Sequence, residues 1–161
     1  MKYSEQITDW LIEQNYTHCF FVGGGNIMHL VESLSLKLKC IPVIHEVAAG
    51  IATEYFNETN DKYRALALVT AGPGLTNIVT AFGGAWLESR ELLVIGTPAK
   101  TVDMSNGEIR QRGIQEINGA DIVRPICKVS RSLTTILSKQ EFIDLISQSW
   151  TGKKGPVFLE I

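Results

Sequence analysis

Apolar residues along the chain follow two kinds of pattern, which alternate from one end to the other. Short continuous apolar runs bounded by glycine, proline or polar residues are typical of strands buried on both faces of a parallel sheet. The runs that predict strands are residues 18–22, 40–44, 64–70, 92–95 and 156–161. Between them, apolar residues recur every three or four positions, which is typical of helices with one buried face.

This helical spacing predicts five helices. They cover residues 4–14, 27–34, the segment that begins near Glu46, 75–89 and 138–150. Ser4 is predicted to cap the first helix, because a serine side chain accepts a hydrogen bond from a free backbone N–H there. Ser138 and Glu141 have the spacing of a capping box at the start of the last helix.

The remaining segments are polar or short. Residues 57–62 predict a polar turn, and residues 120–123 and 126–129 predict two short elements. The segment 97–118 is polar and has no regular pattern, and loops of this length in compact domains are usually functional. The alternation of strands and helices predicts an α/β domain of three layers, with a mostly parallel sheet flanked by helices.

Composition and charge narrow the class of protein. The chain has 161 residues, of which 45% are hydrophobic and 20% are charged, as in an ordinary globular protein. With no repeat or linker, one domain is predicted to fill residues 1–161. The net charge of −2 and the scattered lysines and arginines give no support for binding to nucleic acid or to an anionic membrane.

The cysteines and the first residues indicate the compartment. Cys19, Cys40 and Cys127 are odd in number and form no Cys-x-x-Cys pair, so neither a disulfide framework nor a zinc site is predicted. Free thiols of this kind are typical of the reducing cytoplasm. The polar N-terminus does not resemble a signal peptide, and no run approaches the roughly 20 apolar residues of a membrane span. We therefore expect a cytoplasmic protein.

Glu46 follows an apolar run and begins a segment of very small residues. Parallel α/β sheets bind their ligands at the carboxyl ends of the strands, where Glu46 is predicted to lie. Ala48, Ala49, Gly50 and Ala52 allow close approach by a bulky planar neighbour. A surface glutamate that complements a helix N-terminus explains the same pattern, so both interpretations remain open for this segment alone.

A second segment, Gly72 to Asn77, strengthens the case for a site. Two glycines around Pro73 predict a sharp turn from strand to helix, with exposed backbone on which a flat ligand could stack. Asn77 falls in the first turn of the following helix, where its amide could orient the polar edge of a ligand. A simple turn accounts for the glycines, but it does not explain their occurrence one strand–helix unit after Glu46.

Several familiar catalytic motifs are incomplete in this sequence. In the loop from Gly23 to Asn26, Met28 stands where the third glycine of G-x-G-x-x-G belongs, and Ala49 stands where H-E-x-x-H needs its second histidine. His18 and His29 have no partners at ligand spacing, and neither a nucleophile elbow nor a P-loop occurs. No metal ligands are predicted in this chain, and a noncatalytic nucleotide-binding module remains an alternative.

Four motifs in order resemble the N-terminal pyrimidine-binding domain of thiamine diphosphate enzymes, and among these the acetolactate synthase-like family. They are His45-Glu46 with its small-residue helix, Thr70-Ala-Gly-Pro-Gly-Leu-Thr-Asn77 with Ala85-Trp-Leu-Glu-Ser89, Arg110-Gln-Arg-Gly-Ile-Gln-Glu116, and Gly155-Pro-Val-Phe-Leu-Glu-Ile161. The similarity extends from about Glu5 to Ile161. The resemblance implies a thiamine diphosphate cofactor and the fold of that domain.

The resemblance also implies roles for individual residues. Glu46 is implied to be catalytic and to hydrogen-bond N1′ of the cofactor's aminopyrimidine; a carboxyl group screened from water shares a proton readily, because burial disfavours the bare anion. The cofactor supplies the chemistry, which is decarboxylation of a 2-oxo acid with or without carboligation. The further implied residues are Gly72, Pro73, Gly74 and Asn77 at the pyrimidine, and Gly24, Gly25 and Gln115 on the substrate side.

Two departures leave the substrate open. Ile114 replaces the usual aromatic residue, and Gly23-Gly-Gly-Asn26 replaces the usual Gly-x-Pro-Gly. The Gly-Asp-Gly sequence with which family members hold the diphosphate and Mg²⁺ does not occur here. The resemblance therefore implies a diphosphate-binding domain of another subunit as partner, in a homodimer or larger assembly. We expect the N-terminal part of a longer enzyme, inactive alone, with the small subunit of a split sulfopyruvate or phosphonopyruvate decarboxylase as the alternative.

Overall fold

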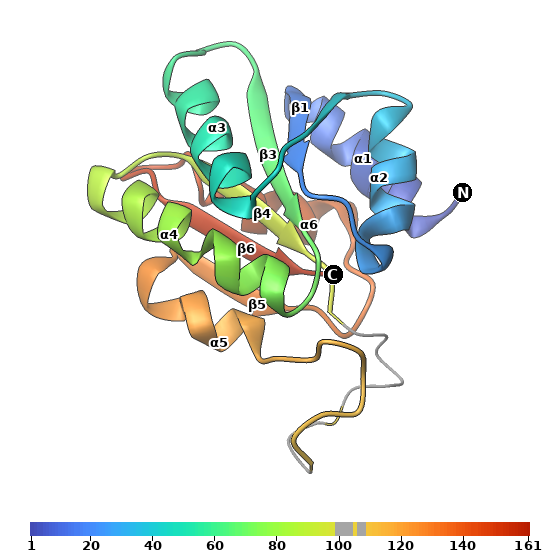
Figure 1. Cartoon of the computed structure of the whole chain (residues 1–161). Helices are drawn as coiled ribbons and strands as arrows, with labels where there is room; N and C mark the ends of the chain where they lie inside the picture. Colours follow the sequence, from blue (N-terminus) through green and yellow to red (C-terminus); the bar gives the residue numbers. More distant parts are fainter. Residues whose placement is uncertain (99–104, 106–108) are drawn as a thin grey trace.

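The computed structural model describes residues 1–98, 105 and 109–161, and its centre is one parallel sheet of six strands (Figure 1). The strand order is β2-β1-β3-β4-β6-β5, and every neighbouring pair is parallel. The strands are β1 (Tyr16–Phe21), β2 (Lys39–Pro42), β3 (Arg64–Val69), β4 (Leu92–Gly96), β5 (Val129–Ser132) and β6 (Pro156–Glu160). The predicted parallel α/β fold is confirmed.

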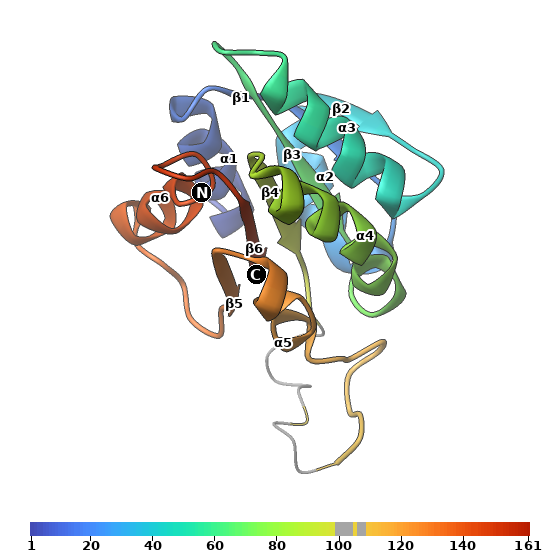
Figure 2. The same cartoon turned by 90° about the vertical axis from the view of Figure 1, so that its left-hand side faces the viewer.

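Helices cover both faces of the sheet (Figure 2). They are α1 (Tyr3–Glu13), α2 (Met28–Ser35), α3 (Glu46–Glu58), α4 (Pro73–Glu88), α5 (Gly119–Val123) and α6 (Lys139–Ser147). One hydrophobic core joins α1, α2 and α6 to the sheet, and the other joins α3, α4 and α5. None of the helices in the described ranges is long and apolar enough to span a membrane.

The apolar run of β3 shows why both faces are covered. Leu66 and Leu68 belong to the core under α1, α2 and α6, whereas Ala67 and Val69 belong to the core under α3 and α4. Successive side chains of a strand point to opposite faces. A strand buried on both faces therefore needs apolar residues at every position, which is the pattern of the sequence.

Helix caps were predicted with mixed success. The capping box of Ser138 and Glu141 is confirmed, with the Ser138 side chain accepting from the Glu141 N–H. The prediction that Ser4 caps α1 is wrong, because the helix begins at Tyr3 and Lys2 is its N-cap residue. The Ser4 hydroxyl instead accepts a hydrogen bond of 2.8 Å from Ser33. Ser4 thus links α1 to α2.

Three predicted boundaries are wrong. Strand β2 ends at Pro42 rather than at residue 44, and Ile44 is fully exposed. Asn57 lies in α3 rather than in a polar turn, and it is buried because its side chain bonds the backbone N–H and C=O of Ala65. Residues 126–129 form no single element, since a 3₁₀ turn covers Arg124–Ile126 and β5 begins only at Val129.

A buried ion pair lies at the amino ends of β3 and β4. Arg64 Nε is 2.9 Å from Glu91 Oε1, without the alignment of a hydrogen bond. Arg64 also donates to the carbonyl of Gln14 at 3.1 Å, and its guanidinium stacks 4.2 Å from the ring of Trp150. Burial raises the pKa of the Glu91 carboxyl, and the Arg64 charge opposes that rise. This end of the sheet is opposite to the carboxyl ends at which ligands are expected.

Candidate functional site

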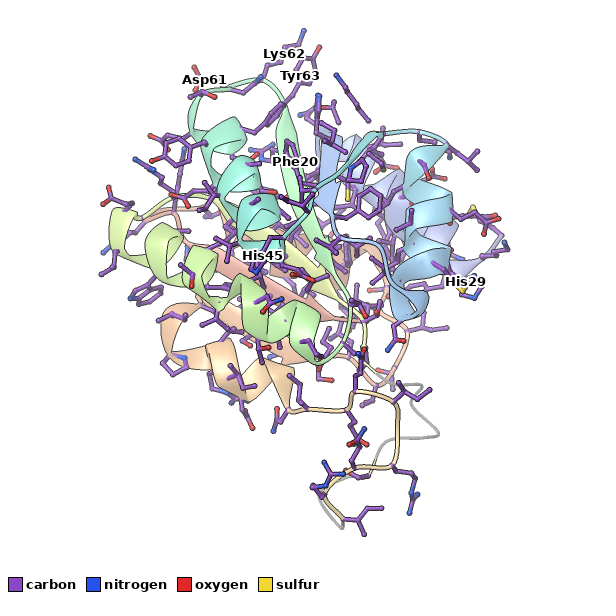
Figure 3. All side chains as sticks on the ribbon, viewed as in Figure 1. Phe20, His29, His45, Asp61, Lys62 and Tyr63 are labelled. Carbon is purple, nitrogen blue, oxygen red and sulfur yellow. The ribbon has the colours of Figure 1, made fainter. Side chains whose placement is uncertain are left out.

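Glu46 is the first residue of α3, directly after the short connection from β2. His45 caps the helix, because its Nδ1 accepts the N–H of Val47 at 3.2 Å. Figure 3 shows His45 at the end of α3 that lies beside α4. Glu46 as a residue is only 7% exposed, so its side chain does not point outward as that of a surface glutamate would. The structure thus holds a carboxylate in a buried position at the carboxyl edge of the sheet.

Glu46 is joined to α4 by one direct hydrogen bond. Asn77 Nδ2 donates to Glu46 Oε2 at 2.9 Å. Asn77 is in the first turns of α4, as the sequence predicts, and it is exposed. Among the described residues, Glu46 Oε1 has no hydrogen-bond partner. One carboxylate oxygen is therefore fixed, and the other remains available to a donor outside the described residues.

The turn of Gly72, Pro73 and Gly74 brings the start of α4 to this carboxylate. Gly72 has φ +63° and is the N-cap residue of α4, and Pro73 occupies the first helical turn. The left-handed region favours glycine, and proline is well tolerated at a helix start. A Cβ placed on Gly74 would lie 3.5 Å from Glu46 Oε1 and 3.0 Å from Thr70 Cγ2. The second glycine thus leaves open the space next to Glu46.

Thr70 connects this turn to the glycine loop after β1, and sequence reasoning missed its position. A Cβ on Gly24 would lie 2.9 Å from Thr70 Cγ2, so Gly24 and Gly74 both pack against the same threonine. Gly25 has no neighbour within 4 Å of its Cβ direction among the described residues. Gly24 thus packs against the centre of the site, whereas the space in the Cβ direction of Gly25 is open among the described residues. The place of Thr70 at the carboxyl end of β3, just before the turn, was the available signal.

Gln115 lies against the other glycine of the turn. A Cβ on Gly72 would lie 2.7 Å from the Gln115 carbonyl oxygen. Gln115 has φ +57°, a backbone conformation that is uncommon for a residue with a side chain. Its side chain is exposed, and no contact with Glu46 is made. Gln115 therefore belongs to a second group of residues, on the Gly72 side of the turn.

Glu116 organises the segment that carries Gln115, and sequence reasoning did not single it out. Its Oε1 accepts from the Ser105 N–H at 2.6 Å and from the Ser105 hydroxyl at 2.7 Å. Its Oε2 accepts from the N–H groups of Arg112 and Gly113 at 2.9 and 3.0 Å. These donors, led by the Arg112 and Ser105 N–H groups, lower the pKa of Glu116 to about 2. Hydrogen bonding to the charged form explains this direction.

We expect Glu116→Ala to loosen this segment without unfolding the sheet. Arg110 and Arg112 are nearby trypsin sites, so limited proteolysis should cut the variant faster than the parent chain. Because the folded-state pKa is depressed, the contribution of Glu116 to loop order is present above the ordinary glutamate pKa. It is lost as the pH falls toward about 2. Cleavage at an unchanged rate would contradict this role.

The control for that experiment is Glu58→Ala. Glu58 is exposed at the end of α3, and its loss should leave the cleavage rate unchanged. Amide hydrogen exchange of residues 109–117 provides the second measurement, because parent and variant can be compared at neutral and at low pH after correction for the intrinsic exchange rates. Slower exchange in the parent than in Glu116→Ala at neutral pH, with a difference that disappears as the pH falls toward about 2, would support the assignment.

The residues around Glu46 fit a flat heteroaromatic group. The carboxylate is buried, one of its oxygens is held by Asn77, and no Cβ at Gly74 fills the adjacent space. Such a carboxyl group can exchange a proton with a ring nitrogen. Within residues 1–98, 105 and 109–161, no group of three His, Cys, Asp or Glu side chains is placed to hold a metal ion.

Comparison with known proteins gives the same family as the motifs. Residues 1–122 match the family described as "Thiamine pyrophosphate enzyme, N-terminal TPP binding domain". The chain is 30% identical to 2-hydroxyacyl-CoA lyase 2 of Danio rerio and 32% identical to that of Caenorhabditis elegans, in each case over 97% of this chain and 24% of the relative. It is 27% identical to the acetolactate synthase large subunit of Buchnera aphidicola, over 98% of this chain and 27% of that relative.

The chain spans about a quarter of the length of these relatives. The family match covers both segments that form the site, since Glu46 and the turn at Pro73 fall within residues 1–122. On this match, and with the parallel α/β fold around it, the chain belongs to the family of thiamine pyrophosphate enzyme N-terminal TPP-binding domains.

Proposed function

We propose that this chain is the pyrimidine-binding domain of a thiamine diphosphate-dependent enzyme that acts on a 2-oxo acid. The observation that carries the proposal is the buried Glu46 carboxylate, with Asn77 bonded to one oxygen and the Cβ-free Gly74 beside the other. A pyrimidine ring against Gly74 would place a ring nitrogen within reach of Oε1. Similarity to an acetolactate synthase large subunit supports the choice of a 2-oxo acid.

Each residue of the site has a separate task in this proposal. Glu46 exchanges a proton with the ring nitrogen at Oε1, and Asn77 fixes the carboxylate so that this oxygen faces the ring. The Gly72–Gly74 turn and Thr70 shape the wall on which the ring rests. When bound, the cofactor supplies a nucleophilic carbon that adds to a carbonyl group and accepts its electrons. Burial of Glu46 limits the access of water to its carboxylate.

We further propose that the diphosphate and its Mg²⁺ are held by a diphosphate-binding domain that docks on the outward face of α3 and α4. This α3–α4 face is defined by Ala48, Ile51, Tyr55, Gly83 and Leu87, which are exposed or half-buried. Gly83 lies inside α4, where a glycine destabilises a helix by about 1 kcal/mol relative to alanine. No described atom lies within 4 Å of its Cβ direction. A close-packed partner outside this chain would explain the glycine.

Gly83→Ala tests this docking face, because it should raise the stability of the chain and weaken its assembly with the partner domain. We expect the free energy of unfolding of the chain to rise by about 0.5 to 1 kcal/mol, because alanine favours the helix and the space is open. Assembly with the diphosphate-binding domain should weaken, because the added methyl group lies in the interface. Denaturant unfolding measures the first effect, and analytical ultracentrifugation measures the second.

The matched control is Ser35→Ala on α2, an exposed helical position on the opposite side of the sheet. It should leave the assembly constant unchanged. Unaltered assembly in Gly83→Ala would show that this face is not part of the interface. The proposed role of Glu46 would not be affected.

The activity is tested on the assembled enzyme with its cofactor and Mg²⁺. Release of carbon dioxide from 2-oxo acids that depends on thiamine diphosphate would support the proposal. A second candidate is cleavage of 2-hydroxyacyl-CoA, which the similarity to 2-hydroxyacyl-CoA lyase 2 favours. Cleavage of the carbon–carbon bond between C1 and C2 of a 2-hydroxyacyl-CoA, with the thioester kept intact and no release of carbon dioxide, would select that candidate. Failure of both reactions, with no cofactor binding, would leave a noncatalytic module.

The diphosphate-binding partner domain can follow in the same polypeptide or be a separate subunit. We favour the N-terminal part of a longer enzyme, since the relatives are about four times the length of this chain. A split decarboxylase with a separate large subunit is the alternative. Separation of this chain from the partner domain as two polypeptides after denaturing dissociation would support two subunits, and a single longer polypeptide would support the first possibility.

A further inference from the structure

A cavity of about 530 Å³ lies on the side of the turn where Gln115 packs. It is bounded by the first turn of α4, through Pro73 and Thr76, and by residues 110–117. In Figure 1 that segment, drawn in yellow and orange, extends beyond the end of the sheet. Pockets of about 300 to 1,000 Å³ accommodate small organic ligands. The cavity is therefore large enough for more than the reacting group of a small 2-oxo acid.

The walls of the cavity have two chemical characters. Pro73, Ile114 and Ile117 give an apolar lining, whereas Arg110 and Gln111 contribute a guanidinium and an amide. The Ile114 side chain is 78% exposed, so packing within the described residues does not explain an isoleucine there. An aliphatic chain in the cavity would cover it. The guanidinium is the kind of group that binds a carboxylate through two parallel hydrogen bonds.

The cavity is built on a fixed framework. Gln115 lies against Gly72 and has φ +57°, and such a conformation of a residue with a side chain persists where the surroundings hold it and often occurs at ligand sites. Glu116 also lines the cavity, and its carboxylate accepts four hydrogen bonds from Ser105, Arg112 and Gly113. Its negative charge is therefore directed at these donors. Of the two charged side chains that line the cavity, the Arg110 guanidinium is therefore the one with which a ligand would interact.

We propose that this cavity is a subsite for the distal part of the substrate, and that it selects an aliphatic chain ending in a carboxylate. The subsite rests on the proposed function, because the reacting end of the same molecule would lie toward the Glu46 side of the turn. Ile114 and Ile117 contact the methylene groups, and Arg110 binds the terminal carboxylate. The substrate class is thus a 2-oxo dicarboxylic acid rather than pyruvate.

Direct binding tests the subsite without turnover. Adipate and hexanoate have the same chain length, but only adipate keeps a second carboxylate. Isothermal titration of the assembled protein should give tighter binding of adipate, and Arg110→Gln should weaken that binding by about tenfold, as expected for a lost charge-assisted hydrogen bond. Arg112→Gln is the matched control, because Arg112 does not line the cavity. Equal affinities for the two acids would overturn the proposal.

Turnover gives the second test. Arg110→Gln should raise KM for 2-oxoadipate by about tenfold while kcat and the values for 2-oxohexanoate stay near those of the parent. Ile114→Phe should narrow the cavity and shift preference from 2-oxoadipate toward pyruvate, and the exposure of Ile114 means that the substitution should not disturb folding. Unchanged preferences in both variants would overturn the subsite.

The two levels of the proposal fail in different ways. If no 2-oxo acid is decarboxylated but adipate still binds through Arg110, the proposed reaction fails and the anion subsite stands. If 2-oxo acids react with cofactor dependence but neither variant changes selectivity or adipate binding, the subsite fails and the reaction stands.

Discussion

Replacement of Glu46 by glutamine is expected to lower kcat of the assembled enzyme by about 10²- to 10⁴-fold, which is the usual contribution of a positioned acid–base group. Glutamine has nearly the same shape and can still accept the hydrogen bond that Asn77 donates to Glu46 Oε2 at 2.9 Å. It cannot exchange a proton with a ring nitrogen. The loss should therefore fall on turnover rather than on folding, and steady-state kinetics with circular dichroism would separate the two.

Glu58→Gln is the matched control for this variant, since Glu58 is an exposed glutamate at the other end of the same helix. It should retain the parent kcat. Glu46→Gln should also retain the unfolding temperature, because the side-chain volume and the bond to Asn77 are kept. Near-parent turnover in Glu46→Gln would refute the assignment of Glu46 as the proton-exchanging residue.

The sequence was sufficient to predict the structural features that depend on local backbone preferences or on a periodic pattern of apolar residues. Apolar residues at every position from Ala65 to Val69 of β3 indicated burial on both faces, because each face of a strand needs its own apolar side chains. Gly72 and Pro73 indicated a turn because their backbone preferences restrict the chain in the same way in any fold. The proximity of Glu46 to that turn followed from parallel topology, which puts the carboxyl ends of strands at one edge.

The sequence could not predict features that depend on partners distant in the chain. Thr70 has the sequence character of a strand residue, and only the fold reveals that Gly24 and Gly74 both pack against it. Asn57 has the composition of a turn, but the backbone of Ala65 satisfies its amide inside the protein. A buried polar group needs such partners, and a single sequence does not identify them.

The role of Glu116 was missed for a related reason. A polar segment without periodicity predicts only a loop, and the four hydrogen bonds to one carboxylate appear only when the segment is folded. The resemblance to a family drew attention to Gln115, its neighbour. In the structure, the hydrogen bonds that connect this segment are made by Glu116, the residue next to Gln115.

The largest expected loss of stability comes from Arg64→Ala, at the other end of the sheet. The substitution leaves the buried Glu91 carboxylate without the guanidinium that lies 2.9 Å away, and it removes the bond to the Gln14 carbonyl and the stacking on Trp150. Breaking a buried ion pair from one side costs about 3 kcal/mol or more. We expect a fall of this size in the free energy of unfolding, measured by denaturant titration at neutral pH.

The pH dependence of that loss distinguishes an unpaired charge from lost packing. Burial already raises the pKa of Glu91, and the Arg64 charge limits the rise, so the pKa should rise further in Arg64→Ala. A group with a raised folded-state pKa stabilises the fold below its ordinary pKa and loses that contribution as the pH rises through the raised value. The difference between variant and parent should therefore shrink in acid.

The control is Arg124→Ala, which removes an exposed ion pair with Asp121. It should change the free energy of unfolding by less than about 1 kcal/mol. A deficit in Arg64→Ala that is the same at acid and neutral pH would assign the loss to the Trp150 and Gln14 contacts instead.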